Sequence, residues 1–134
     1  MSEPSKSPKI MRSMLGRARG LGSAKSGTAH WWAQRVTALA LLPLSLWFLW
    51  SVLGMVRHDR AWVAHFVADP VVATLLVAFI VTSFHHMQLG VQVVIEDYVH
   101  AERPKLLGLL AMKAASGLLG LAAVIAVLKL AFTG

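Results

Sequence analysis

The sequence predicts an all-α integral membrane protein in which three transmembrane helices follow a basic N-terminal tail. Of its 134 residues, 57% are hydrophobic and only 14% are charged, and the mean hydropathy is +0.64. A soluble domain of this size could cover so much apolar surface only by associating, whereas membrane helices have this composition. Three long apolar runs, each sufficient to cross a ~30 Å hydrocarbon core, provide the helices.

The predicted tail, residues 1–30, holds six basic residues and one acidic residue: Lys6, Lys9, Arg12, Arg17, Arg19 and Lys25 against Glu3. A basic segment before a membrane span favours the cytoplasmic side and contacts anionic lipid. We therefore expect a multi-pass protein of the inner (cytoplasmic) membrane with its N-terminus in the cytoplasm. No nucleic-acid partner is expected, because no nucleic-acid-binding signature accompanies the charge. The remainder, residues 31–134, is predicted to be a three-helix membrane anchor domain.

The first span is expected at about residues 36–56, a run of 21 residues without a charge. Pro43 lies within this run and is expected to kink the helix. Trp31 and Trp32 precede the span, as is typical of side chains at headgroup level. The polar segment after the span, residues 57–70, is expected to be a loop in water.

The second and third spans are expected at about residues 71–95 and 106–132, joined by a charged loop. Pro104 suits the first turn of the third helix. Further along that helix, Ser116 and Gly120 place two small residues on one face, which lets another helix come close. Three spans put the two ends of the chain on opposite sides of the membrane.

The chain has no cysteine. Disulfides, thiolate zinc sites and iron–sulfur clusters ligated by this chain are therefore excluded. Any metal must be held by histidine or methionine, or by a partner.

Two adjacent histidines, His85 and His86, lie inside the second apolar run. An ionisable residue near the bilayer centre costs roughly 2.5 to 3.5 kcal/mol on insertion scales and by default indicates function. At 100° per residue, His86 shares a helix face with Gly90, whose missing side chain would leave a flat recess beside the imidazole. A porphyrin bound edge-on needs such a recess, with a histidine nitrogen as axial ligand to its iron.

His85 points roughly 100° away from His86 and belongs to a different stripe of the helix. The other polar residues of this stripe are Gln88, Gln92 and Glu96. In lipid, such a stripe is usually a helix contact or a water-lined path. His85 is also a second candidate ligand, since the preference for His86 rests only on its spacing to the glycine and the aspartate that follow.

Asp97 and Tyr98 mark the membrane boundary at the end of the second span. Asp97 comes 11 residues after His86 and so returns to the same helix face roughly 16 Å further along. There a phenol can donate a hydrogen bond to a carbonyl, and a carboxylate can pass protons from water. A helix end with an interfacial tyrosine anchor explains the pair equally well.

The joint spacing of these residues resembles a known family. The second of the three spans contains His86, Gly90 and the Asp97-Tyr98 pair, and the first begins with Gln34-Arg35-Val36-Thr37-Ala38. This arrangement is similar to the D-type hydrophobic membrane anchor of succinate dehydrogenase, respiratory complex II. The resemblance extends over about residues 31–134.

The resemblance implies a role for each matching residue. His86 would ligate the iron of haem b, with the second axial histidine supplied by the other membrane anchor, which is of the C type. Tyr98 would hydrogen-bond the ubiquinone head group, and Asp97 would belong to the polar and proton network of the same site. Arg35 would contact the haem propionates, and a cation beside a buried dianion is sensible electrostatics.

The resemblance also implies a subunit that is not an enzyme on its own. The chain would anchor a flavoprotein subunit (A) and an iron–sulfur subunit (B). Succinate would be oxidised in those partners, and electrons would pass to ubiquinone at the membrane, which links the tricarboxylic acid cycle to electron transport.

Two other interpretations stay open. A small membrane transporter subunit or scaffold, with no redox role, would use the stripe of His85 as a proton or solute path. The anchor of a fumarate reductase, or of another quinone-linked haem protein, would share the membrane site with a different physiological direction.

Overall fold

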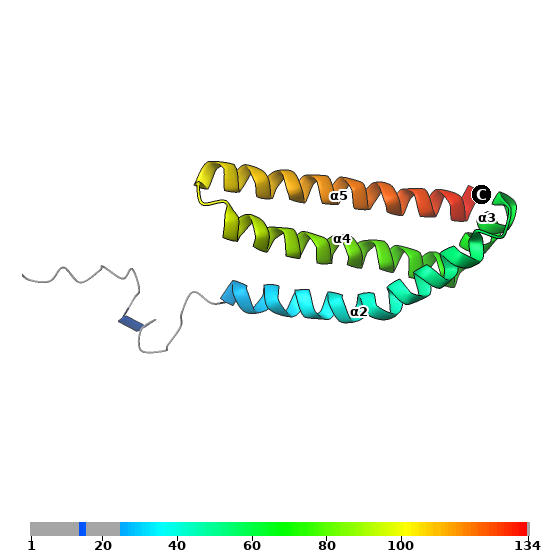
Figure 1. Ribbon diagram of the computed structural model, residues 1–134, viewed down its shortest axis with the longest axis horizontal. Helices are drawn as coiled ribbons and strands as arrows, with labels where there is room; N and C mark the ends of the chain where they lie inside the picture. Colours follow the sequence, from blue (N-terminus) through cyan, green and yellow to red (C-terminus); the bar gives the residue numbers. More distant parts are fainter. Residues whose placement is uncertain (1–13, 16–24, 134) are drawn as a thin grey trace, which may run out of the picture.

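The computed structural model describes residues 14–15 and 25–133, so most of the predicted basic tail lies outside the described residues. Within 25–133 the chain forms three long helices and one short one, and no strand. They are α2 (Lys25–Met55), α3 (Arg60–Ala68), α4 (Pro70–Tyr98) and α5 (Glu102–Thr133). The long helices lie side by side, with α4 between α2 and α5 (Figure 1).

The three long helices confirm the predicted all-α fold with three membrane helices, and each begins before the range expected from hydropathy. Each is long and apolar enough to cross a membrane: Gly27–Met55, Pro70–Tyr98 and Glu102–Thr133. Hydropathy marks the part of a helix at hydrocarbon depth, whereas the backbone can remain helical through the headgroup region. α2 accordingly begins at Lys25, before the paired tryptophans, and Pro104 lies in the first turn of α5 as predicted.

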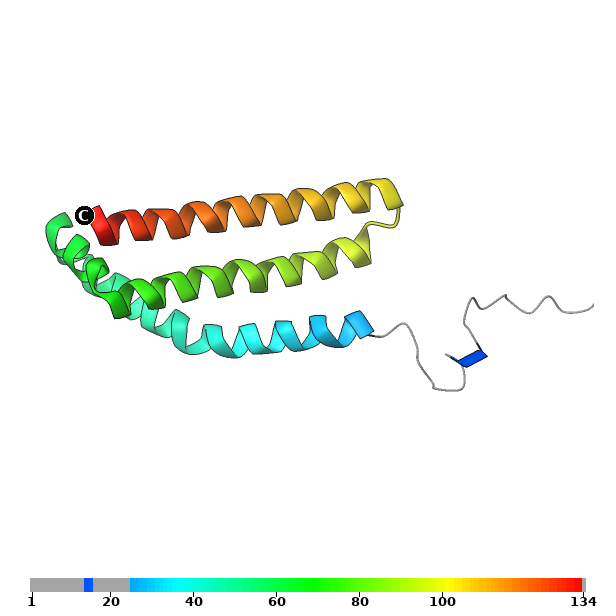
Figure 2. The ribbon, with the colours of Figure 1, turned by 180° about the vertical axis from the view of Figure 1, so that it is seen from behind.

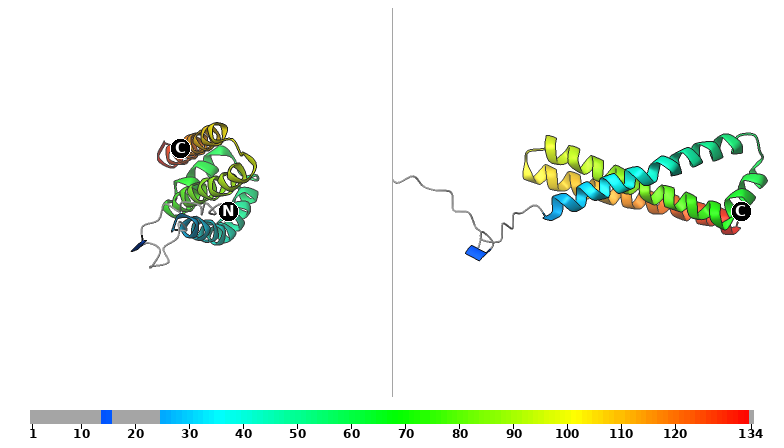
Figure 3. Two further views of the ribbon diagram at one scale, coloured as in Figure 1. Left: turned by 90° about the vertical axis from the view of Figure 1, so that its left-hand side faces the viewer. Right: turned by 90° about the horizontal axis from the view of Figure 1, so that it is seen from below.

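α2 remains one helix through Pro43. Its second half bends toward α3 (Figures 1 and 2), consistent with the kink expected where proline removes an intrahelical hydrogen bond. Seen from below, α2 crosses α4 and α5 obliquely, and α3 bridges the ends that diverge (Figure 3).

The prediction of a loop over residues 57–70 is wrong in its middle, where α3 forms. Asp59 caps this helix, because its side chain accepts a hydrogen bond from the backbone N–H of Trp62 at 2.9 Å. Three rings then stack along one side of the segment, His58 on Trp62 and Trp62 on Phe66. An aspartate followed by aromatic residues four apart was the signal for this helix in the sequence.

α3 also joins the long helices at this end of the molecule. Its Ala64 and Val67 are buried, and it packs against both α4 and α5. Asp69 then caps α4 by accepting hydrogen bonds from the backbone N–H groups of Val71 and Val72, at 2.8 and 3.1 Å. Asp69 therefore marks both the end of α3 and the beginning of α4.

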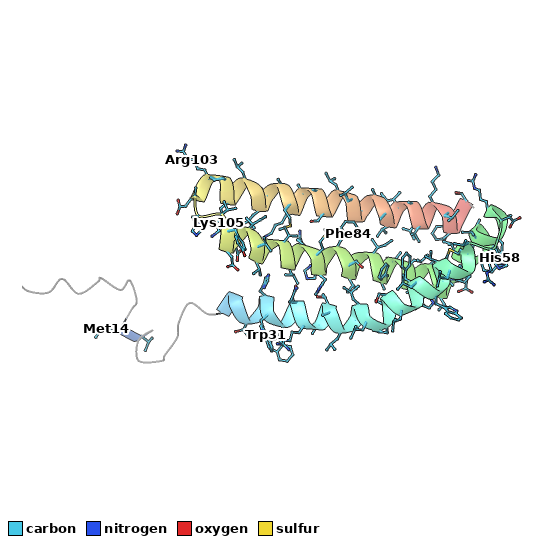
Figure 4. All side chains as sticks on the ribbon, in the orientation of Figure 1. Met14, Trp31, His58, Phe84, Arg103 and Lys105 are labelled. Atoms are coloured by element: carbon cyan, nitrogen blue, oxygen red, sulfur yellow. The ribbon has the colours of Figure 1, made fainter. Side chains whose placement is uncertain are left out.

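Small residues of α5 allow the close approach to α4 that the sequence predicted. Ser116 is only 4% exposed and accepts a hydrogen bond from Gln88 Nε2 at 3.1 Å. One turn later, a Cβ atom added to Gly120 would lie 3.3 Å from Cγ of Phe84. Figure 4 shows Phe84 between the two helices. Ser116 and Gly120 thus fix the position of α4 on its α5 side.

The two ends of the bundle carry different parts of the chain. The beginning of α2 and the turn between α4 and α5 lie at one end, while α3 and the end of α5 lie at the other (Figure 1). Arg103 and Lys105 mark the first end and His58 the second (Figure 4). Most large apolar side chains of the long helices are exposed in the isolated chain, as expected where lipid or other membrane helices surround them.

Gly120→Leu is expected to lower the free energy of unfolding by about 1–3 kcal/mol, because the new side chain would meet Phe84 in a packed contact. The matched control is Gly117→Leu in the same helix, since nothing lies within 4 Å of the Cβ position there. Unfolding in mixed micelles, followed by circular dichroism, measures both variants. Equal losses of stability would contradict this account of the α4–α5 contact.

Candidate functional site

His86 connects α4 to α2 in the half of the bundle that contains the beginning of α2. Its Nδ1 lies 2.9 Å from Oγ1 of Thr37. Thr37 Oγ1 also lies 2.7 Å from the backbone oxygen of Ala33 and 3.1 Å from that of Gln34. One side of the imidazole is therefore engaged by a hydroxyl that α2 itself holds in place.

Gly90, one turn after His86, lies against the same helix. A Cβ atom added at Gly90 would lie 3.7 Å from Gln34 Nε2, an ordinary van der Waals contact. The recess expected beside the imidazole thus receives a side chain of α2 on this side. A Cβ atom would therefore fit at Gly90 without displacing α2.

Two polar atoms of α2 are buried here without a hydrogen-bond partner in the structure, Nε2 of His30 and Oε1 of Gln34. A buried polar atom left unpaired costs about 1–3 kcal/mol, and such atoms in a native protein call for an explanation. His30, Gln34 and Thr37 share one helix face because they are spaced i, i+4 and i+7. In the sequence, that spacing was the signal from which this face of α2 could have been assigned to the site.

Arg35 lies on an adjacent face of α2. Its Cζ is 4.5 Å from the centroid of the Trp31 ring, a cation–π contact, and both side chains are exposed. Trp31 lies on the side of α2 away from α4 (Figure 4). The structure therefore does not bring Arg35 together with His86 within this chain.

Asp97 and Tyr98 are the last two residues of α4. The helix continues unbroken from His86 to Tyr98, so Asp97 does return to the face of His86. Both side chains are exposed, Tyr98 to 79%. In the described part of the chain, neither side chain makes a hydrogen bond or an ion pair. Both remain available to a partner or a ligand.

The polar stripe of His85 divides into separate contacts. Gln88 reaches α5 through Ser116, which makes it a helix contact, while Gln92 donates to Glu96 on its own helix at 2.8 Å. His85 is exposed. Among the described residues, no group of three or more His, Cys, Asp or Glu side chains gathers that could hold a metal ion. A metal bound through either histidine would need donors from elsewhere.

The three long helices and the junction between His86 of α4 and Thr37 of α2 define a class of protein. It is a small multi-pass membrane subunit with a histidine at a helix–helix contact. Comparison with protein families identifies the particular one. Residues 9–128 match the family described as succinate dehydrogenase/fumarate reductase transmembrane subunit. Because the match covers most of the 134 residues, the chain belongs to this family. The resemblance found from the sequence is thereby confirmed.

Individual relatives agree with the family. The chain is 36% identical over 116 residues to the succinate dehydrogenase hydrophobic membrane anchor subunit of Rickettsia bellii, covering 87% of this chain and 93% of that protein. It is 37% identical over 84 residues to the protein of the same name from Rickettsia conorii, covering 62% and 67%. The succinate dehydrogenase membrane anchor subunit of Reclinomonas americana is 31% identical over 96 residues, covering 63% and 73%.

Family membership confirms two predictions. The chain is a membrane-spanning subunit of an oxidoreductase of this type, and it is non-catalytic on its own. The interpretation as a transporter subunit loses its support, since the residue stripe on which it rested is divided between two contacts.

The hydrogen bond between Gln88 and Ser116 is expected to contribute about 0.6 kcal/mol, the average for interhelical hydrogen bonds in membranes. A double-mutant cycle with Gln88→Ala and Ser116→Ala, measured by unfolding in mixed micelles, gives this coupling energy. The control cycle pairs Gln92→Ala with Ser116→Ala and should be additive, because Gln92 bonds within its own helix. Coupling of similar size in both cycles would contradict the assignment.

Proposed function

We propose that this chain is the D-type anchor of a succinate:ubiquinone oxidoreductase of the inner membrane. It docks the flavoprotein subunit (A) and the iron–sulfur subunit (B) at the cytoplasmic face. Together with a second, C-type anchor, it forms a haem b site and part of a ubiquinone site. The observation that supports this most directly is the junction of His86 with α2, in a chain that belongs to the transmembrane-subunit family.

The residues at the junction fit one half of a haem site. His86 supplies one imidazole, and the porphyrin and a partner's histidine would complete the coordination of iron. The unpaired Nε2 of His30 and Oε1 of Gln34 show that this face of α2 has unused hydrogen-bonding capacity. A polar cofactor edge or an ordered water would satisfy them.

In the proposed site, His86 would ligate the haem iron and Arg35 would bind a propionate. Arg35 is exposed on the flank of α2 and lies over the Trp31 ring. Within residues 25–133 its guanidinium makes no ion pair, which leaves its donors available to a carboxylate. When bound, haem supplies a one-electron carrier at this depth of the membrane. The part of this chain is to hold and orient that group through α2 and α4.

Tyr98 and Asp97 are proposed to act on the quinone. The exposed Tyr98 hydroxyl would donate a hydrogen bond to a quinone carbonyl and so stabilise the negative charge that develops there during reduction. Asp97, exposed at the same helix end, would pass protons from water, since both quinone oxygens end as hydroxyl groups. Electrons arrive from the iron–sulfur subunit, because this chain has no cysteine to hold a cluster.

The arrangement of the ends supports one membrane orientation. The beginning of α2, Tyr98 and the turn before α5 share one end of the bundle, and the basic tail precedes α2. By the positive-inside rule this end faces the cytoplasm. The soluble subunits and the quinone site would therefore meet on the same side.

The anchor of a fumarate reductase is the second candidate, because the description of the matching family includes both enzymes. Both candidates predict the same membrane site. The ratio of succinate oxidation to fumarate reduction by the purified complex distinguishes them.

His86→Ala is expected to abolish or shift the b-type signal in a reduced-minus-oxidised visible spectrum of the chain copurified with its partners, because the variant lacks the proposed ligand. His85→Ala is the matched control, adjacent in the sequence and exposed, and should leave the spectrum unchanged. A signal that depends on His85 instead would overturn the ligand assignment. A wild-type complex without haem would overturn the haem site as a whole.

Tyr98→Phe is expected to lower succinate:ubiquinone reductase turnover by roughly 100-fold, a typical loss for a single hydrogen-bond donor to a developing charge. The haem spectrum and the copurification of the partner subunits serve as controls and should not change, because Tyr98 is exposed at the end of α4. Unchanged turnover would remove Tyr98 from the mechanism.

A further inference from the structure

The contacts of the Thr37 hydroxyl determine where its hydrogen lies. A hydroxyl has one hydrogen to donate and lone pairs to accept with. Thr37 Oγ1 is 2.7 Å from the Ala33 carbonyl oxygen, which can only accept. Two oxygens at this distance without a hydrogen between them would repel each other, so the hydroxyl hydrogen is directed at the backbone.

The same contacts determine the hydrogen of the imidazole. Because the hydroxyl hydrogen is used on α2, the 2.9 Å contact between Thr37 Oγ1 and His86 Nδ1 is a hydrogen bond only if Nδ1–H donates. A neutral imidazole has a hydrogen on one ring nitrogen and a lone pair on the other. Nε2 of His86 therefore holds the lone pair that a metal ligand needs.

We propose that Thr37 is a positioning residue that holds His86 in the tautomer with a free Nε2 and so prepares it to ligate the haem iron. The proposal rests on the proposed function, in which His86 is the ligand. Ligating histidines usually donate their second ring N–H to a nearby acceptor, which fixes the ring and makes the ligand more basic. Thr37 would be that acceptor within this chain.

A purely structural role for the hydroxyl does not explain this contact. Thr74 in α4 makes the same bond to the carbonyl four residues earlier, at 2.7 Å to Pro70, and is exposed. The hydroxyl of a threonine in a membrane helix can thus donate its hydrogen bond to a carbonyl of the same helix, without a second helix. What distinguishes Thr37 is that its remaining lone pair is directed at a histidine 49 residues away in the sequence.

Thr37→Val removes the acceptor with little change in shape, Thr37→Ser restores it, and Thr74→Val is the matched control. In the full chain purified without haem, histidine ¹⁵N spectra report the tautomer, with His86 assigned from the signal that His86→Ala loses. In the complex, a redox titration reports the haem midpoint potential. Thr37→Val should mix the two tautomers of His86 and raise the potential, because a less basic ligand stabilises ferric iron less.

Thr37→Ser and Thr74→Val should both behave as wild type in the two measurements. If Thr37→Val leaves either the tautomer or the potential as in Thr74→Val, the positioning role of Thr37 is overturned while the haem site stands. If the wild-type complex binds haem but His86→Ala does not affect it, or if it binds none, the proposed ligand itself fails and the role of Thr37 fails with it. The two failures are therefore distinguishable.

Discussion

Polar contacts between helices at bilayer depth determine how the long helices of this bundle pack. α4 carries His86 and Gln88, and each of these side chains pairs with a different neighbouring helix. His86 meets Thr37 of α2, and Gln88 meets Ser116 of α5. Because His86 and Gln88 are two residues apart on one helix, their contacts lie on different sides of α4 and place it between α2 and α5. The apolar surface of the bundle, which faces lipid or other subunits, does not by itself specify such a position.

The two parts of the proposed site lie at different places along α4. Deep in the helix, His86 contacts α2 where two further polar atoms of that helix have no hydrogen-bond partner among the described residues. At its end, Asp97 and Tyr98 are exposed, as their proposed contact with a quinone requires. The proposed haem and quinone contacts need different surroundings, and both lie on the one continuous helix α4. Its end lies beside the beginning of α2 (Figure 1), where soluble partners would dock.

Sequence reasoning predicted what depends on a single helix. The three spans follow from hydropathy, the shared face of His86 and Asp97 from helical periodicity, and the close approach at Ser116 from residue size. It did not predict α3, because this nine-residue helix is too short to cross a membrane and its charged and histidine-containing flanks were interpreted as a loop in water. Sequence reasoning also gave no role to Thr37 or His30, because their neighbours on α4 are known only once α2 and α4 are packed together. Arg35 was assigned to the haem propionates by resemblance, and within this chain it lies over the ring of Trp31.

The central claim is that His86, held by α2, forms half of a haem site. A density map of the assembled complex, at a resolution that shows side chains and cofactors, tests it most directly. The account predicts a porphyrin whose iron is bonded to Nε2 of His86, while Nδ1 keeps its contact with Thr37. Iron bonded to His85, or a complex in which α2 and α4 meet at His86 with no porphyrin beside them, would contradict it.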